Sequence, residues 1–289
     1  MGDTITSEGV LRAEQLLVAG EDEQARDLLA ALAADIEEYA GRNCQATDSE
    51  QWFSFPTIFE RIAYRRVEKD PRELHDVGEP FDRVYGDLAF AQVRLGDYDA
   101  AIEALKQAVR WDPMECAYRL DLAELFENAG NHDEFLALSY SVFERASRAE
   151  HLVRAYLNFA SHYAKTGNPK LQAACLRCAR RFEMPSSALD AALDQAAGTA
   201  ADPDAISDDE AASLLAAEGI EYGANAEIAI CLLMCATDAA SMGDNGFATD
   251  CTVRARDLVG SAACKALIEL IRESDEDIAR EEGQDAGEA

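Results

Sequence analysis

The chain has 289 residues and a formal net charge of −30, from 56 acidic and 26 basic side chains. A surface this acidic repels nucleic acid and anionic membranes, which excludes general binding to either. Apolar residues make up 48% of the chain, and the longest apolar run is about half of the roughly 18 residues that a transmembrane helix needs. The first residues lack the basic and apolar regions of a signal peptide, so we expect a cytoplasmic protein.

Residues 1–45 predict a helical hairpin. Val10 and Leu17 mark the apolar face of its first helix, Gly20 stands in the turn, and Leu29 and Ile36 lie on the stripe of the second helix. Such a hairpin is either a degenerate repeat or a cap that closes a repeat array with a polar outer face.

Residues 46–80 lead from this hairpin to the centre of the chain and contain its densest aromatic cluster, residues 52–55. Polar residues 41–51 predict a loop before the cluster, and Pro56 suits the first turn of a helix after it. The aromatic side chains either close the end of a helical array or form an exposed patch that binds a partner.

The helix that follows Pro56 carries the one concentrated basic stripe of the sequence. Arg61, Arg65 and Lys69 are four residues apart and therefore share one face. This stripe is either a solvated face paired with neighbouring glutamates or a site that binds an anion.

Residues 81–198 repeat one helical hairpin. Its turns contain Gly96, Gly130 and Gly167, which are 34 and 37 residues apart. Glycine suits the left-handed position at a helix end because it has no Cβ atom. A period near 34 predicts stacked helix–turn–helix units, with an ordinary helical bundle as the alternative.

The first unit resembles the tetratricopeptide repeat, and its matching residues are Tyr85, Leu88, Ala89, Gly96, Tyr98, Ala101, Leu105, Ala108 and Pro113. The second copy has an irregular second helix and keeps Leu122, Ala123, Phe126 and Gly130. The third copy keeps Tyr156, Phe159, Ala160, Tyr163, Gly167, Leu176 and Ala179. The resemblance implies an all-α fold, a right-handed α-α superhelix of antiparallel helix hairpins, and a non-enzymatic function in binding other proteins.

The C-terminal part begins after an additional helix at residues 186–197 and a candidate linker at residues 199–205. Residues 206–273 predict further helical hairpins, of which the one around Gly243 is a possible worn copy of the repeat. Residues 274–289 are acidic and without apolar periodicity, which predicts a disordered tail.

The sequence lacks phosphate-binding, nucleophile-elbow and zinc-protease motifs, so we expect neither enzymatic activity nor a cofactor. The eight cysteines are expected to be reduced thiols that pack as small apolar side chains. A zinc or redox site formed by Cys175, Cys178, Cys231 and Cys235 is the competing hypothesis.

In the family that the array resembles, the first helix of each unit lines a concave groove. The residues expected on that face are Arg83, Phe90, Arg94, Leu120, Glu124, Asn128, Arg154, Leu157, Ser161 and Lys165. The positions of the family's clamp for a C-terminal carboxylate hold Gly86, Phe90, Asp121, Arg154 and Asn158, so we do not expect that clamp here.

The expected partner is an extended or helical protein segment, with acidic groups near the basic residues of this face and an apolar anchor near Phe90 and Leu157. Self-assembly into a homo-oligomer is the alternative function. A second alternative is that the arginines only neutralise neighbouring carboxylates.

Overall fold

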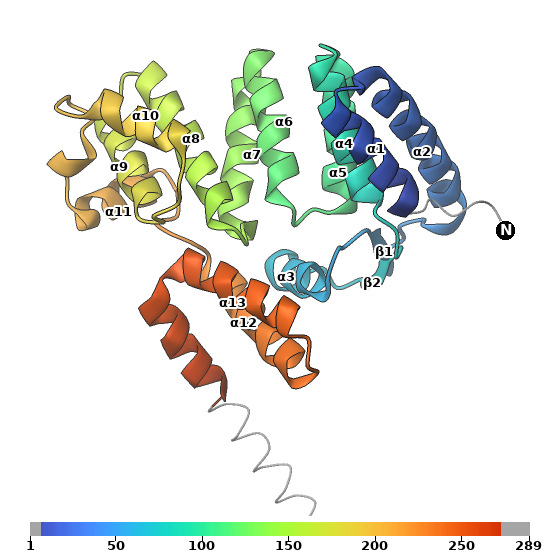
Figure 1. Cartoon of the computed structure of the whole chain (residues 1–289). Coiled ribbons are helices and arrows are strands. Elements are labelled where there is room, and N and C mark those ends of the chain that lie inside the picture. The colour runs from blue at the N-terminus through green and yellow to red at the C-terminus, as the bar shows by residue number, and fades with distance from the viewer. Residues whose placement is uncertain (1–6, 273–289) are drawn as a thin grey trace, which may run out of the picture. The chain divides into compact units, whose positions relative to one another are not determined.

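The computed structural model describes residues 7–272, and the chain divides into two compact units between Arg145 and Ala146 (Figure 1). Helices dominate both units, and the fold class is the all-α helical repeat that the sequence predicts. Within the described residues, no helix combines the length and the apolarity that crossing a bilayer requires. The acidic tail expected at residues 274–289 lies outside the described part of the chain.

Unit 1, residues 1–145, consists of three helical hairpins, with two short strands and a helix inserted after the first. The first hairpin comprises α1 (Ser7–Ala19) and α2 (Asp22–Asn43). The inserted segment comprises β1 (Glu50–Phe53), α3 (Ile58–Glu68) and β2 (Glu73–Asp76). The other hairpins comprise α4 (Phe81–Arg94), α5 (Tyr98–Trp111), α6 (Cys116–Asn128) and α7 (His132–Arg145).

The hairpin turns share one backbone geometry. After α4, Gly96 adopts a φ of +79°, and the N–H of Asp97 donates to the carbonyl of Gln92 at 2.8 Å. This bond closes the last turn of the helix, and the Asp97 side chain then accepts the N–H of Ala100 at the start of α5. The same backbone pattern recurs at Gly20, Gly130, Gly167 and Gly243. The prediction of left-handed glycines in the turns is therefore confirmed.

One apolar core runs through unit 1 from α1 to α6. Ala101 and Ala108 of α5 are fully buried, and their small side chains let α5 approach α4 closely. Leu105, on the same stripe, is also buried. Leu29 and Ile36 of α2 belong to the same cluster, so the N-terminal hairpin shares the core of the hairpins that follow it.

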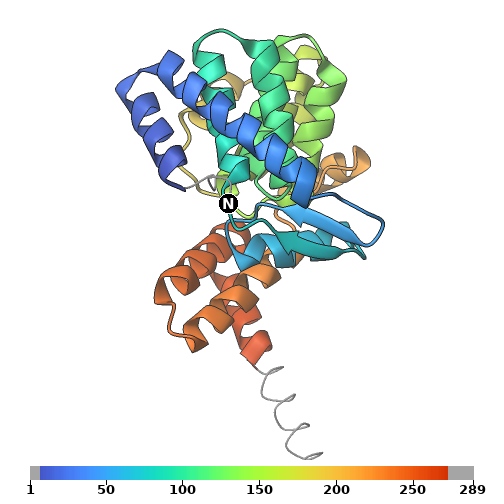
Figure 2. The same cartoon turned by 90° about the vertical axis from the view of Figure 1, so that its right-hand side faces the viewer.

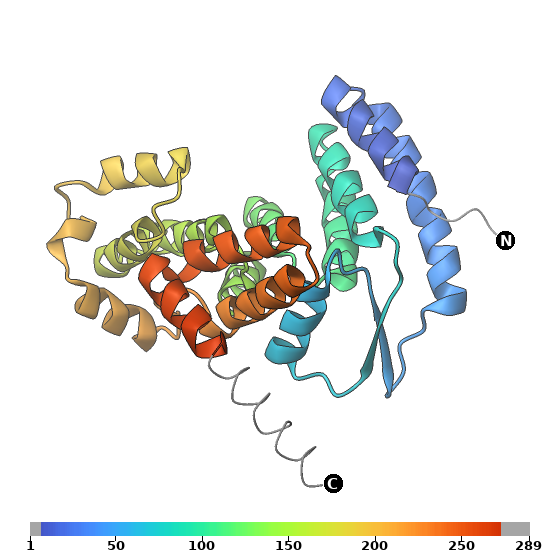
Figure 3. The same cartoon turned by 60° about the horizontal axis from the view of Figure 1, so that its bottom comes forward.

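Strands β1 and β2 are a feature that the sequence did not predict. They pair in parallel, with Glu50 opposite Glu73 and Phe53 opposite Asp76. Figure 3 shows the chain passing from α2 through β1, α3 and β2 into α4. The loop expected over residues 41–51 is thus shorter, because α2 extends to Asn43 and β1 begins at Glu50. Each strand has only four residues, too few for a visible alternation of apolar side chains.

The aromatic cluster at the end of β1, residues 52–55, is mostly buried inside unit 1. The rings of Phe53 and Phe55 stack with centroids 4.6 Å apart, and Tyr64 of α3 lies 4.5 Å from Phe53. Phe53 and Phe55 are buried, whereas Trp52 is half-buried on the other face of the strand. Figure 2 shows the two strands side by side next to α3. The cluster therefore holds the inserted segment together and is not an exposed patch.

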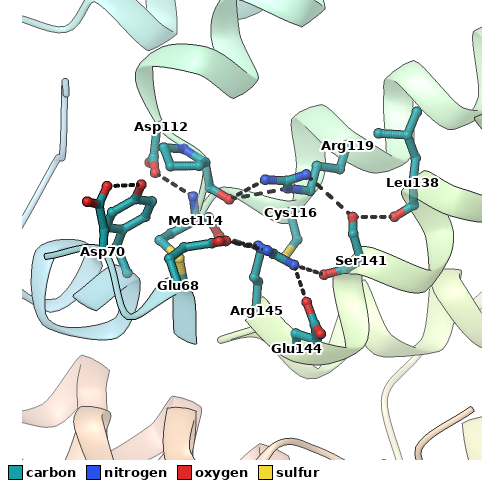
Figure 4. A network of polar contacts seen from close by, with 12 residues as sticks. Glu68, Asp70, Asp112, Met114, Cys116, Arg119, Leu138, Ser141, Glu144 and Arg145 are labelled. Carbon is teal, nitrogen blue, oxygen red and sulfur yellow. Dashed lines mark hydrogen bonds and ion pairs between the residues drawn. The ribbon is translucent and has the colours of Figure 1, made fainter. Parts of the chain in front are cut away.

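A network of polar contacts joins this inserted segment to the third hairpin (Figure 4). The guanidinium of Arg145, at the end of α7, donates to Glu68 at the end of α3, with Nε 3.0 Å from Oε1. Arg145 also donates to the Ser141 carbonyl and to Glu144. Nearby, Arg119 of α6 donates to the Pro113 carbonyl. These contacts fix α3 on α7.

Unit 2, residues 146–289, begins with one hairpin, continues through shorter helices and, in its described part, has a second hairpin around Gly243. Its elements are α8 (Ala149–Lys165), α9 (Pro169–Arg180), α10 (Ser187–Ala196), the 3₁₀ helix η1 (Pro203–Ala205), α11 (Asp208–Ala217), α12 (Ala226–Ser241) and α13 (Asn245–Val259). Residues 261–272 are also helical.

The candidate linker at residues 199–205 is packed into unit 2. Pro203 is buried within η1, and Arg177 of α9 donates to its carbonyl at 2.8 Å. Residues 199–205 are therefore a structured connection and not a loose linker.

Tyr156 of α8 holds the loop before α12, since its hydroxyl donates to the Glu221 carbonyl at 2.5 Å and accepts the N–H of Gly223 at 2.9 Å.

Candidate functional site

The helix α4 presents three of the residues that the sequence places on a binding face. Arg83, Phe90 and Arg94 are all exposed. Phe90 is seven residues after Arg83 and four before Arg94, so the three share one side of α4. Both arginines contact the first hairpin. We call this area the first-helix surface, and it comprises Leu11, Glu14 and Val18 of α1, Arg83, Asp87, Phe90 and Arg94 of α4, and Asp121, Glu124 and Asn128 of α6.

The two arginines of this surface are paired with acidic side chains from the first hairpin. Arg83 donates to Glu14 of α1. Arg94 lies 3.1 Å from Asp22 and also donates to the carbonyl of Leu17 at 3.0 Å. Two of the basic residues expected to attract an acidic ligand therefore already have acidic partners, as the neutralisation alternative predicts for them.

Phe90 is the most prominent apolar residue of α4, with 52% of its surface exposed. The guanidinium of Arg94 lies over its ring at 5.6 Å from the centroid. Because Arg94 also binds the Leu17 carbonyl, Phe90 is close to the end of α1, where Val18 is 91% exposed. Leu11, one helical turn before Glu14, is exposed as well. Sequence reasoning missed these two apolar residues, although they share a helical face with Glu14.

Helix α6 contributes polar residues to the first-helix surface. Glu124 and Asn128 are exposed, as expected for a binding face. Leu120 is buried, with 1% exposure, so its side chain is not available to a ligand. Tyr118 covers Gly86 of α4 so closely that a Cβ atom there would lie 2.6 Å from the ring. This contact explains why position 86 lacks a side chain.

The remaining four expected residues belong to α8, in unit 2. Arg154 and Leu157 are half-buried, whereas Ser161 and Lys165 are exposed. The ten residues expected to form one groove are therefore divided between two compact units. Six of them lie in unit 1, which alone supplies the exposed aromatic residue of the set.

Asp87 lies near two charged residues of the first-helix surface, Glu14 and Arg83. Its Oδ2 atom is shielded from solvent and has no hydrogen-bond partner. Burial, together with the nearby Glu14, raises the pKa of Asp87 to about 6, and Arg83 only partly opposes the shift. Protonation of this carboxyl is therefore coupled to the folded state of α4 and α1.

We expect Asp87→Asn to stabilise the protein near neutral pH. The folded-state pKa lies above that of an unfolded aspartate, so this group stabilises the fold fully below about pH 4, and the contribution is lost as the pH rises through about 6. An uncharged asparagine avoids that loss, by on the order of 1 kcal/mol after solvent screening. Urea unfolding at pH 7.5 and at pH 4 measures the difference, which should nearly vanish at pH 4.

The exposed aspartate of α5, Asp99, provides the control for this substitution. Asp99→Asn should change the free energy of unfolding equally little at both pH values. A loss of stability in Asp87→Asn at pH 7.5 would show instead that the charged carboxylate of Asp87 supports the fold.

The basic stripe of α3 is solvent-exposed. Arg61, Arg65 and Lys69 have no carboxylate at ion-pair distance within the described residues. Glu68, one of the neighbouring glutamates, instead contacts Arg145. Pairing with neighbouring glutamates is therefore wrong for these three residues, and anion binding stays a prediction.

The cysteine pairs of the competing zinc or redox hypothesis are buried in helices. Cys175 and Cys178 lie in α9, and Cys231 and Cys235 lie in α12. Burial raises the pKa of Cys175 and raises that of Cys178 to about 11. A cysteine binds zinc as the thiolate, and a raised pKa disfavours that form. In the described part of the chain, the four sulfur atoms do not form one cluster of ligand atoms.

Comparison with known families identifies the hairpin that carries Phe90. Residues 82–113, which span α4 and α5, match the family model of the tetratricopeptide repeat. The matched segment contains Arg83, Phe90 and Arg94. No curated protein matches the chain in sequence.

Proposed function

From a tetratricopeptide repeat at residues 82–113, we propose that unit 1 is a non-enzymatic protein-binding module. It takes up an extended or helical segment of another protein on the first-helix surface. Repeats of this family generally bind proteins or peptides, and the helical-repeat fold of unit 1 is that of an interaction scaffold. Two kinds of observation support this surface as the site: the exposure of its apolar residues and the pairing of its charges.

The single observation that carries the proposal is the exposure of Phe90. Large aromatic residues are enriched at the centre of protein interfaces, where burial of their surface supplies much of the binding energy. Phe90 lies in the middle of α4 with 52% exposure, although the other aromatic residues of that helix, Phe81 and Tyr85, are buried. Val18, next to the Leu17 carbonyl that Arg94 binds, offers a ligand a second exposed apolar side chain.

The charges around Phe90 fit the polar rim of such an interface. Arg83 and Arg94 are held by Glu14 and Asp22, so they are fixed in place as hydrogen-bond donors. An acidic ligand would have to compete with these carboxylates. The proposed ligand is therefore defined first by an apolar side chain that contacts Phe90, and only second by acidic groups.

The residues of α8 belong to the proposal as a second binding face. Ser161 and Lys165 are exposed there, with Leu157 half-buried. Self-assembly through the first-helix surface is the competing function, because an exposed aromatic residue serves equally well in a contact between two copies.

Photo-crosslinking in the cells that produce the protein tests the proposal. A photoreactive phenylalanine analogue replaces Phe90 in the full-length chain. The matched control carries the same analogue at Tyr140, which is 40% exposed on α7, the second helix of its hairpin. We expect a covalent adduct with another protein from position 90 and none from position 140, because the ligand lies along first helices.

Each outcome of this experiment decides between the functions. Adducts from position 140 without adducts from position 90 would place the ligand on the second helices and overturn the proposal. An adduct of twice the 31.5 kDa chain mass from position 90 would establish self-assembly instead. The absence of any adduct at both positions would argue against a protein ligand on either face.

A further inference from the structure

The outer face of the two-stranded sheet carries three potential metal ligands. Side chains two residues apart along a strand lie on the same face. Glu50 and Trp52 of β1 therefore share a face with the residues opposite them, Glu73 and His75 of β2. The ligand atoms of Glu50, Glu73 and His75 all lie within 4.8 Å of one another.

The two carboxylates lie in an unfavourable arrangement without a cation. Glu50 and Glu73 are directly opposite each other, where like charges destabilise a strand pair. In the described part of the chain, neither carboxylate has an arginine or lysine at ion-pair distance. A bound cation would remove this repulsion.

The histidine supplies a second, independent indication. Its Nε2 atom is shielded from solvent, has no hydrogen-bond partner, and lies 3.9 Å from Oε1 of Glu50. The ring stacks on Trp52, with centroids 4.5 Å apart and an angle of 25° between the planes. The stacking holds the imidazole ring against Trp52, with Nε2 on the side of Glu50. A buried nitrogen without a partner costs free energy that a metal bond would offset.

We propose that Glu50, Glu73 and His75 bind a divalent transition-metal ion of the zinc class. One imidazole nitrogen with two carboxylate oxygens suits Zn²⁺ and its neighbours, whereas Mg²⁺ and Ca²⁺ prefer oxygen ligands alone. Bonds of about 2.0–2.2 Å place ligand atoms roughly 3.3 Å apart, so the glutamate side chains must move inward. Glu50 has the freedom to do so, since its side chain is 46% exposed.

Such an ion would join β1 to β2 at the base of the inserted segment. Three protein ligands leave at least one coordination position open to water or to a ligand from another molecule. The site is independent of the first-helix surface, so its presence or absence leaves the proposed protein-binding function untouched.

Isothermal titration of the metal-free, full-length chain with Zn²⁺ under reducing conditions tests this inference. We expect saturation at one ion per chain, with binding weakened at least tenfold in His75→Ala and in Glu73→Gln. The control, His132→Ala, removes an exposed histidine that contacts Glu127 on another hairpin, and it should bind Zn²⁺ normally. Because all variants keep the same eight cysteines, zinc binding by thiols contributes equally to each of them.

Three results would overturn the inference. They are unchanged Zn²⁺ binding in both His75→Ala and Glu73→Gln, equally tight binding of Ca²⁺, and no saturable binding of Zn²⁺. Far-UV circular dichroism checks that the variants are folded. If His75→Ala unfolds, Glu73→Gln decides the question, because it changes one exposed atom of a surface side chain.

Discussion

Replacing Leu105 with alanine is expected to lower the free energy of unfolding of unit 1 by about 2–5 kcal/mol, the range for a buried leucine in a close-packed core. Leu105 is 3% exposed and belongs to the core cluster with Leu88 of α4 and Ala108 of α5. Alanine leaves a cavity there that two packed helices cannot fill without moving. Urea unfolding followed by tryptophan fluorescence measures the loss, because both tryptophans, Trp52 and Trp111, lie in unit 1.

The surface residue Val18 provides the matched comparison. Val18→Ala removes apolar atoms from a side chain that is 91% exposed, so its effect should stay within about 0.5 kcal/mol. A cost below 1 kcal/mol for Leu105→Ala would mean that α4 and α5 do not pack through this residue. The assignment of residues 82–113 as a hairpin packed through Leu105 would then be wrong.

The second large effect is expected at the ion pair between α7 and α3. Arg145→Met should cost about 2–3 kcal/mol, somewhat less than the ~3–5 kcal/mol for breaking a fully buried pair, because solvent reaches Glu68. The Arg145 side chain is 11% exposed and that of Glu68 is 31% exposed. Methionine removes the cation and leaves the Glu68 carboxylate without its donor. Urea unfolding by tryptophan fluorescence again measures the change.

A double-mutant cycle with Glu68→Gln separates the pair from its surroundings. The combined variant should lose less than the sum of the two single changes, because each single change already breaks the same contact. Arg42→Met is the control, since Arg42 and Glu38 form an exposed pair on α2 whose loss should cost less than about 1 kcal/mol. Simple additivity at Arg145 and Glu68 would contradict the direct interaction that fixes α3 on α7.

The hairpin turns were predictable because their signals are local. A helix end in the left-handed conformation favours glycine at that residue, and the next helix favours aspartate or asparagine at its N-cap. Gly96 with Asp97 and Gly167 with Asn168 carry both signals within two residues. The structure realises both, with the glycines at positive φ and the polar side chains as caps.

The strands and the charge pairs were not predictable because they depend on distant residues. Glu50 and Glu73 are paired across a helix, in strands of four residues each. Arg83 contacts Glu14, 69 residues earlier in the chain, and the spacing of residues within α4 says nothing about that contact.

The burial of Leu120 is a similar case. The repeat pattern alone cannot show whether a leucine next to the packing stripe points into the core or out of it. The burial of Leu120 depends on which helices pack around α6, and the sequence of α6 alone does not show that. The position of α4 that corresponds to Leu120, 34 residues earlier, is Gly86, and Phe90, one helical turn after it, remains exposed.

The central claim is that a protein ligand binds the first-helix surface through Phe90. The most direct test measures the affinity of the partner captured by crosslinking for Phe90→Ala and for Tyr140→Ala. An aromatic residue at the centre of an interface contributes at least about 2 kcal/mol, so Phe90→Ala should weaken binding about 30-fold or more. Tyr140→Ala should bind as the unmodified chain does. Equal affinities for Phe90→Ala and the unmodified chain, with a loss in Tyr140→Ala, would contradict the claim.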